Sequence, residues 1–180
     1  QINPHFLYNS LSLINWKAIE YGQDDISSIT LALSNYYRTS LNKGKNTLTV
    51  KQELSNMESY LNIQQIMHDN SFDVVMDIDE NVLEYESLNL ILQPLVENAI
   101  EHGIDLLTDR RGVITVVAKL HNGLIHIEVK DNGIGMPKET AHTFLTSESG
   151  GYGARNVNDR IRLFYGEQYN LKVSSDENGT

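Results

Sequence analysis

The sequence feature that most constrains the fold is a pair of alternating, β-branched segments at residues 112–121 and 124–131. They are joined at Asn122-Gly123, which is the strongest short-range signal for a β-hairpin. Residues 72–79, FDVVMDID, alternate in the same way and predict another strand. The second half of the chain is therefore expected to contain a sheet.

The first 68 residues show helical periodicity instead. Three helical stretches are separated by the polar segments YGQDD and NKGKNT. Successive steps of four, three and four residues place a set of mainly polar side chains on one face of the first predicted helix. That set is His5, Asn9, Ser12 and Trp16.

The charge and composition exclude several classes of partner. With 24 acidic and 14 basic residues, the net charge is −10. Nucleic acids and anionic membrane surfaces attract clustered Lys and Arg, so we expect no nucleic acid partner and no direct membrane contact. The absence of cysteine excludes disulfides and thiolate metal sites.

The order of the predicted elements indicates an α+β protein with two domains. A helix is expected around residues 88–103, with Pro94 in its first turn or at a kink, and another at 154–165. Residues 169–175, YNLKVSS, predict a strand whose own partner would lie beyond the present end. We therefore expect a helical domain at residues 1–68 and a two-layer α/β sandwich at 69–180 that lacks its last strand.

Three short segments of the second domain have residues suited to ligand binding. ENAIEHG places Asn98 and His102 on one helix face. DNGIGM places an aspartate before a glycine turn, and GGYGARN places glycines before a helix whose free N–H groups can hold an anion. Each segment alone also fits an ordinary helix, turn or loop, and none of them forms a Walker A motif.

In this order the three segments resemble the N, G1 and G2 boxes of the GHKL superfamily of ATPases and kinases. The resemblance implies that Asn98 holds Mg²⁺ against the phosphates of ATP, with His102 at the edge of the pocket. A neutral amide oxygen suits this hard ion, which takes its other ligands from water and phosphate. The loop ending at residues 151–154 would close over the phosphates. Its ATP-binding residues would be Gly151, Tyr152, Gly153 and Ala154.

The G1 segment would recognise the base. By the same resemblance, Asp131 accepts a hydrogen bond from the adenine amino group, Gly133 and Gly135 allow the backbone to approach the base, and Met136 lines the pocket. A carboxylate accepts hydrogen bonds but does not donate them, so the site is expected to prefer ATP to GTP.

With the N-terminal segment in front of this domain, nearly the whole chain resembles the LytS/YesM-type sensor histidine kinases. The matching motifs are PHFLYN at residues 4–9, LSNYYRTSL at 33–41, YLNIQ at 60–64 and LQPLVENAIEHG at 92–103. The resemblance implies a sensor histidine kinase of a two-component system, in which the ATP γ-phosphate is transferred to His5 and then to an aspartate of a response regulator. It also implies a homodimer that is the cytoplasmic portion of an integral membrane protein.

Proton handling around His5 stays open at this point. Phe6 follows His5 where many other histidine kinases have an acidic residue, so Asn9 and Glu97 are assigned supporting catalytic roles. Two alternatives also remain: a non-catalytic nucleotide-binding regulator, and a GHKL ATPase or serine/threonine kinase in which the helices have no part in phosphotransfer.

Overall fold

The computed structural model describes residues 3–40, 46–146 and 152–180. By its internal contacts the chain divides into two compact units. The first consists of Gln1–Asn70 with Glu84–Leu90, and the second of Ser71–Leu83 with Ile91–Thr180. The sequence did not predict that Glu84–Leu90, a segment within the expected second domain, belongs to the first unit.

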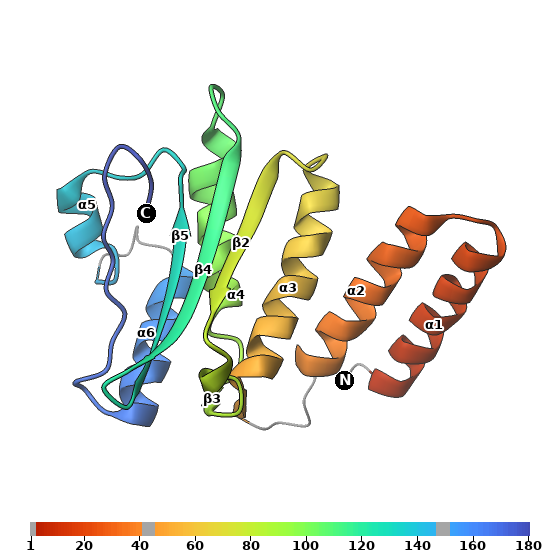
Figure 1. Ribbon diagram of the computed structural model, residues 1–180, viewed down its shortest axis with the longest axis horizontal. Coiled ribbons are helices and arrows are strands. Elements are labelled where there is room, and N and C mark those ends of the chain that lie inside the picture. Colours follow the sequence, from red (N-terminus) through yellow and green to blue (C-terminus); the bar gives the residue numbers. More distant parts are fainter. Residues whose placement is uncertain (1–2, 41–45, 147–151) are drawn as a thin grey trace. The chain divides into compact units, whose positions relative to one another are not determined.

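The first unit is mainly helical (Figure 1). Helices α1 and α2 pack side by side as a hairpin, and α2 also contacts α3. A small antiparallel sheet pairs β1 with β3. The elements of this unit are α1 (Pro4–Glu20), α2 (Asp24–Ser40), β1 (Thr47–Thr49), α3 (Val50–Met67) and β3 (Glu86–Leu88).

Local capping explains where these helices begin. The side chain of Asn3 accepts hydrogen bonds from the N–H groups of His5 and Phe6, and Pro4 occupies the first helical turn, where a missing N–H costs nothing. Helix α3 begins with a capping box between Thr49 and Gln52. His5 is thus fixed within the first turn of α1.

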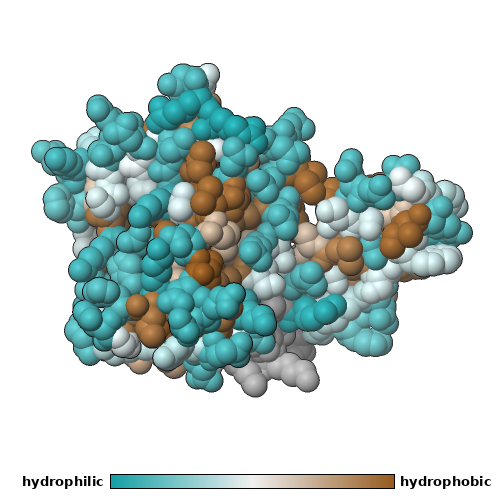
Figure 2. Space-filling view, in the orientation of Figure 1, coloured by the Kyte–Doolittle hydropathy of each residue, from teal (hydrophilic) through white to brown (hydrophobic). Residues whose placement is uncertain are grey.

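The α1–α2 hairpin leaves many large apolar side chains exposed, and Figure 2 shows apolar residues reaching its surface. Of α1, only Leu11 and Ala18 are buried. None of the described helices is long and apolar enough to cross a membrane. The exposed apolar residues of the hairpin are Phe6, Leu13, Ile14, Trp16, Ile19, Tyr21, Ile26 and Leu31.

The second unit is built on a sheet of order β2-β4-β5 with helices packed on it (Figure 1). The strands are β2 (Phe72–Ile78), β4 (Gly112–His121) and β5 (Leu124–Asp131). Strands β4 and β5 form the expected hairpin, in which Asn122 and Gly123 both have positive φ, 50° and 77°. Strand β2 pairs with β4 in parallel, so the sheet is mixed.

One face of this sheet supplies the core. Alternate residues of β4 are fully buried, as are Phe72 at the start of β2 and apolar residues of the helices, whereas the later residues of β2 on this face are only partly buried. The helical elements of this unit are η1 (Glu80–Val82), α4 (Gln93–Asn98), the π turn η2 (Ala99–Gly103), η3 (Ile104–Leu106), α5 (Lys138–Thr143) and α6 (Tyr152–Tyr165). The α+β fold class predicted from the sequence is confirmed.

Two predictions of secondary structure need correction. The helix expected over 88–103 begins only at Gln93, with Pro94 in its first turn, because Leu88 still belongs to strand β3 and the turn that follows it holds Leu90 at φ +55°. Residues 169–175 form no strand. A strand needs a neighbour for its backbone groups, and the N–H of Leu171 instead donates to Asn158 Oδ1 at 3.0 Å.

Candidate nucleotide-binding site

The turn that follows β5 is packed directly against the π turn η2. A Cβ atom added to Gly133 would lie 2.4 Å from the Cα atom of Gly103, and one added to Gly103 would lie 2.7 Å from Oδ1 of Asp131. Real Cβ atoms do not approach so closely, so both positions require glycine. The structure therefore brings together the ENAIEHG and DNGIGM segments, as expected. Gly103, which ends the first motif, was not singled out from the sequence.

Asp131, the last residue of β5, is half-buried beside this contact. Its Oδ1 accepts the N–H of Gly133 at 2.8 Å. Burial raises the pKa of the Asp131 carboxyl, and hydrogen bonds from main-chain N–H groups offset part of that rise. A buried carboxylate with a raised pKa gains most from a further hydrogen-bond donor, which a ligand can supply.

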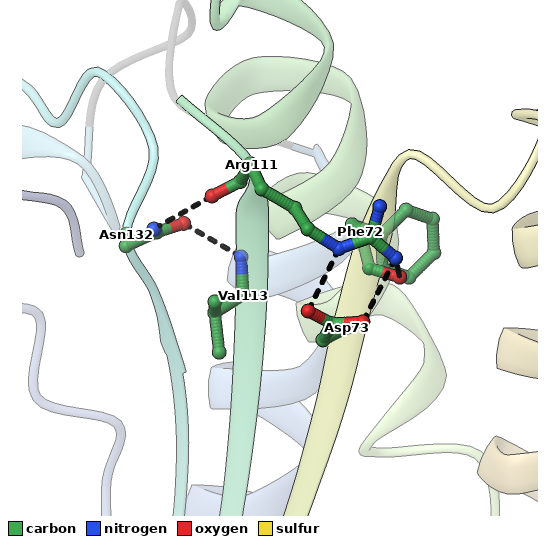
Figure 3. A network of polar contacts seen from close by, with 5 residues as sticks. All are labelled: Phe72, Asp73, Arg111, Val113 and Asn132. Atoms are coloured by element: carbon green, nitrogen blue, oxygen red, sulfur yellow. Dashed lines mark hydrogen bonds and ion pairs between the residues drawn. The ribbon is translucent and has the colours of Figure 1, made fainter. Parts of the chain in front are cut away.

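Asn132 extends the β4–β5 pairing beyond the last strand residue (Figure 3). Its Oδ1 accepts the N–H of Val113 at 2.7 Å, and its Nδ2 donates to the carbonyl of Arg111 at 3.0 Å. The Arg111 guanidinium in turn donates to the carboxylate of Asp73 on β2 at 2.7 and 2.8 Å. The start of β4 is thus bonded to Asn132 on one side and, through the Arg111 side chain, to β2 on the other.

Residues 175–180 lie against the other side of the turn. Gly135 has φ +64°, and a Cβ atom there would lie 1.7 Å from the carbonyl oxygen of Asp176. Met136, which is half-buried, donates its N–H to Ser175 Oγ at 2.8 Å, and the N–H of Asp131 donates to the carbonyl of Thr180 at 2.9 Å. No motif or periodicity in the sequence indicates these contacts beyond the strand expected at 169–175.

Asn98 lies where α4 passes into the π turn, a local geometry that is frequent at functional sites. Its Nδ2 atom is buried and has no hydrogen-bond partner among the described residues. An unsatisfied buried amide fits a ligand that would complete its hydrogen bonds. In the described part of the chain no three His, Cys, Asp or Glu side chains cluster to hold a metal. A cation bound there would need the amide oxygen of Asn98, because the unpartnered Nδ2 is a hydrogen-bond donor.

Glu97 and His102, which lie near Asn98 in the sequence, differ from it in hydrogen bonding and exposure. Glu97 Oε1 accepts a hydrogen bond from Gln93 Nε2 at 2.6 Å, one helical turn earlier. His102 is exposed. The roles assigned to Glu97 and His102 from the sequence stay predictions.

The glycine segment before α6 is described from Tyr152 onward, and Gly151 lies outside the described residues. Tyr152 is 84% exposed, whereas Ala154 is buried. A Cβ atom on Gly153 would lie 3.0 Å from Cβ of Pro94, so this glycine lets α6 approach α4 closely. The N-terminus of α6 is thus adjacent to the helix that carries Asn98.

His5 belongs to the first unit, where its side chain is exposed on α1. Its Nδ1 lies 3.4 Å from Nδ2 of Asn9, one turn along the helix. Phe6 is 71% exposed. The helical spacing predicted for His5 and Asn9 therefore brings the ring and the amide together.

Comparison with protein families assigns both halves of the chain. Residues 1–72 match the family described as histidine kinase. Residues 84–180 match the family of histidine kinase-, DNA gyrase B- and HSP90-like ATPases.

Curated relatives span the whole chain. Sensor histidine kinase YesM of Bacillus subtilis strain 168 is 38% identical over 182 residues, covering 100% of this chain and 31% of that protein. Sensor protein LytS of Staphylococcus saprophyticus is 33% identical, with 100% and 31% covered. Sensor histidine kinase YpdA of Escherichia coli K12 is also 33% identical, with 96% and 30% covered. The chain thus spans about a third of the length of these relatives.

Solved structures share the fold. The histidine kinase domain of the blue-light activated kinase of Erythrobacter litoralis EL346 matches with a TM-score of 0.55 and 17% identity, over 97% of this chain and 91% of that one. Histidine kinase ThkA, solved in complex with the response regulator protein TrrA, matches with a TM-score of 0.53 and 16% identity, over 98% and 55%. The chain belongs to the family of histidine kinase-, DNA gyrase B- and HSP90-like ATPases, whose model matches more than half of it; its first 72 residues match the histidine kinase family, and over its whole length it is similar to sensor kinases of the LytS and YesM type.

Proposed function

We propose that this chain is the kinase core of a two-component sensor histidine kinase, which transfers the γ-phosphate of ATP to His5 and then to an aspartate of a response regulator. The observation that carries the proposal is the half-buried Asp131 carboxylate, set beside the Gly103–Gly133 contact and given one hydrogen bond by its own turn. This arrangement suits recognition of one amino group on a flat base.

The nucleotide would bind in the second unit. Asp131 would accept the hydrogen bond of the adenine amino group, while Gly133, Gly135 and Met136 border the base. The free N–H groups that begin α6 would face the phosphates, in the loop that includes Gly151 and Gly153. The amide oxygen of Asn98 would hold Mg²⁺, which when bound offsets the phosphate charge. The unpartnered Nδ2 of Asn98 is then free to donate to a phosphate oxygen.

His5 would act as the nucleophile through a neutral ring nitrogen. An unperturbed imidazole is largely neutral near pH 7, so a lone pair is available without prior deprotonation. A bond forms between this nitrogen and the γ-phosphorus, and the bond from that phosphorus to the bridging oxygen of ADP breaks. The proton on the other ring nitrogen is then released. Asn9, at 3.4 Å, would orient the ring, and Glu97 would act as a base or support the metal.

The exposed apolar side chains of α1 and α2 support a homodimer. Leu13, Ile14, Ala18, Tyr21 and Ile26 line an apolar groove on this hairpin, and two hairpins can bury such surfaces in a four-helix bundle. The response regulator would dock on the same helical unit, near His5. The relative ThkA was solved in complex with a response regulator. We place the chain in the cytoplasmic portion of a membrane-bound sensor, as its sensor kinase relatives suggest.

The test is incubation of the protein with γ-labelled ATP and Mg²⁺. A label that is labile in acid and stable in alkali is expected, and His5→Gln should abolish it. His121→Gln, which changes another exposed histidine, should leave the label unchanged. An acid-stable label would favour a serine/threonine kinase instead. Nucleotide binding without any label would favour a non-catalytic regulator, and ATP hydrolysis without label an ATPase.

A further inference from the structure

We infer that Arg110 is a positioning residue for Asp131 and thereby sets the selectivity of the site for adenine. The inference rests on the proposed function, because it concerns the base that Asp131 recognises. Arg110 lies two residues before β4, outside all the motifs found in the sequence.

The Arg110 guanidinium donates hydrogen bonds to main-chain carbonyls of the turn. Its Nε and Nη2 donate to the carbonyl of Asn132 at 3.1 and 2.9 Å, and Nη2 also donates to the carbonyl of Gly133 at 2.9 Å. The planar fork of an arginine suits such paired acceptors, whereas a lysine offers a single point charge. One side chain therefore holds two successive peptide groups.

The first of these peptide groups connects Arg110 to Asp131. The carbonyl of Asn132 and the N–H of Gly133 belong to one peptide unit, and that N–H donates to Asp131 Oδ1 at 2.8 Å. Because a peptide unit is planar, holding its carbonyl also fixes the direction of its N–H. Hydrogen bonds in a chain polarise one another, so the cation at one end also strengthens the bond at the other. Arg110 thus orients the carboxylate without touching it.

The adjacent arginine provides a matched control. Arg111 donates to Asp73 on β2, and among the described residues its guanidinium makes no hydrogen bond to the turn. Both arginines are partly exposed, and they directly precede the same strand. The ion pair of Arg110 with Asp109, at 3.5 Å and exposed, contributes little to stability. A comparison of variants at the two positions therefore separates the loss of the hydrogen bonds to the turn from the loss of a positive charge.

The first measurement needs no nucleotide. Hydrogen exchange of the Gly133 amide, followed by NMR in the free protein, should be about two- to tenfold faster in Arg110→Ala and in Arg110→Lys, since the loss of one net hydrogen bond corresponds to a change of that size. Arg111→Ala should leave it unchanged. Unchanged exchange in the two Arg110 variants would overturn the inference, whatever the protein binds.

The second measurement compares ADP with purine riboside diphosphate, which lacks only the amino group. Arg110→Ala and Arg110→Lys should bind ADP about five- to tenfold more weakly and the analogue almost as well as the unchanged protein does. An equal loss for both ligands, or full recovery in Arg110→Lys, would make Arg110 a charge contact and overturn the inference. If the unchanged protein itself does not prefer ADP, the proposed role of Asp131 fails, and the exchange result still decides whether Arg110 positions that carboxylate.

Discussion

The two residues proposed to meet ATP, His5 and Asp131, are held to very different degrees. His5 is exposed in the first turn of α1, and its ring has a long contact of 3.4 Å to Asn9. Asp131 is half-buried and receives an N–H from its own turn, while its main-chain N–H is bonded to Thr180. Glycines pack closely on both sides of that turn.

The difference follows from what each residue has to do. Selecting a base by one amino group requires a fixed acceptor, because a carboxylate that can turn away would accept other partners. A phosphoacceptor has to reach a donor and later a partner protein, so it needs exposure. The chain thus combines a preorganised recognition turn with an accessible nucleophile.

The largest effect is expected where the turn is most closely packed. Gly135→Ala places a Cβ atom 1.7 Å from the carbonyl of Asp176 at φ +64°. We expect a loss of about 2–5 kcal/mol in the free energy of unfolding, from the left-handed backbone and the overlap together. Denaturant unfolding measures it.

Gly123→Ala is the matched control for this change. Gly123 also has positive φ, +77°, but nothing lies within 4 Å of an added Cβ atom. It should lose only about 1–2 kcal/mol, which is the backbone cost alone. Equal losses at the two positions would contradict the close approach of residues 175–180 to the turn.

Asp131→Asn should separate binding from stability. It keeps an acceptor for the Gly133 N–H but removes the buried charge, so nucleotide affinity should fall more than about tenfold. Because burial raises the pKa of the folded carboxyl, the charge destabilises the fold increasingly as pH rises from the ordinary value of 3.8 through the raised one. The variant should therefore gain stability over the unchanged protein at pH 7 but not at pH 3.5.

Asp73→Asn is the control for Asp131→Asn, because its effect on stability at pH 7 is expected to have the opposite sign. The hydrogen bond from Arg111 lowers the pKa of the Asp73 carboxyl, so its stabilisation is present above 3.8 and is lost as pH falls through the lowered pKa. Denaturant unfolding should show that Asp73→Asn lowers the free energy of unfolding at pH 7 and lowers it less at pH 3.5. The same change of stability with pH in both variants would refute the opposite pKa shifts of the two carboxyls.

The smallest effect is expected at the exposed end of α1. Asn9→Ala removes one long hydrogen bond on the surface, so the free energy of unfolding should change by less than about 0.5 kcal/mol. The rate of His5 labelling should fall by less than about tenfold, in proportion to one hydrogen bond. A complete loss of label with the fold intact would give Asn9 a larger catalytic role than orientation.

The sequence predicted the elements whose pattern is local. The Asn122-Gly123 hairpin, strand β2, helix α6 and the α+β class were all expected and are confirmed. The contact between the segments of Asn98 and Asp131 followed from a motif order rather than from periodicity. Patterns of this kind identify which segments meet, but not what holds them.

The contacts that hold the turn could not be predicted, because they join side chains to distant main-chain groups. Arg110 and Ser175 bond to the backbone 22 and 39 residues away, and such bonds leave no period or motif in the sequence. The strand expected at 169–175 was wrong because alternation alone does not supply a pairing partner.

The packing of Gly103 on Gly133 has a further consequence for how related sequences can differ. Five residues of π turn connect Asn98 to this contact, and a residue removed or added there rotates all that follows by about 100°. Gly103 would then face away from Asp131. Insertions and deletions among relatives should accordingly be absent between these two positions, and segments such as the tip of the β4–β5 hairpin should absorb the variation in length.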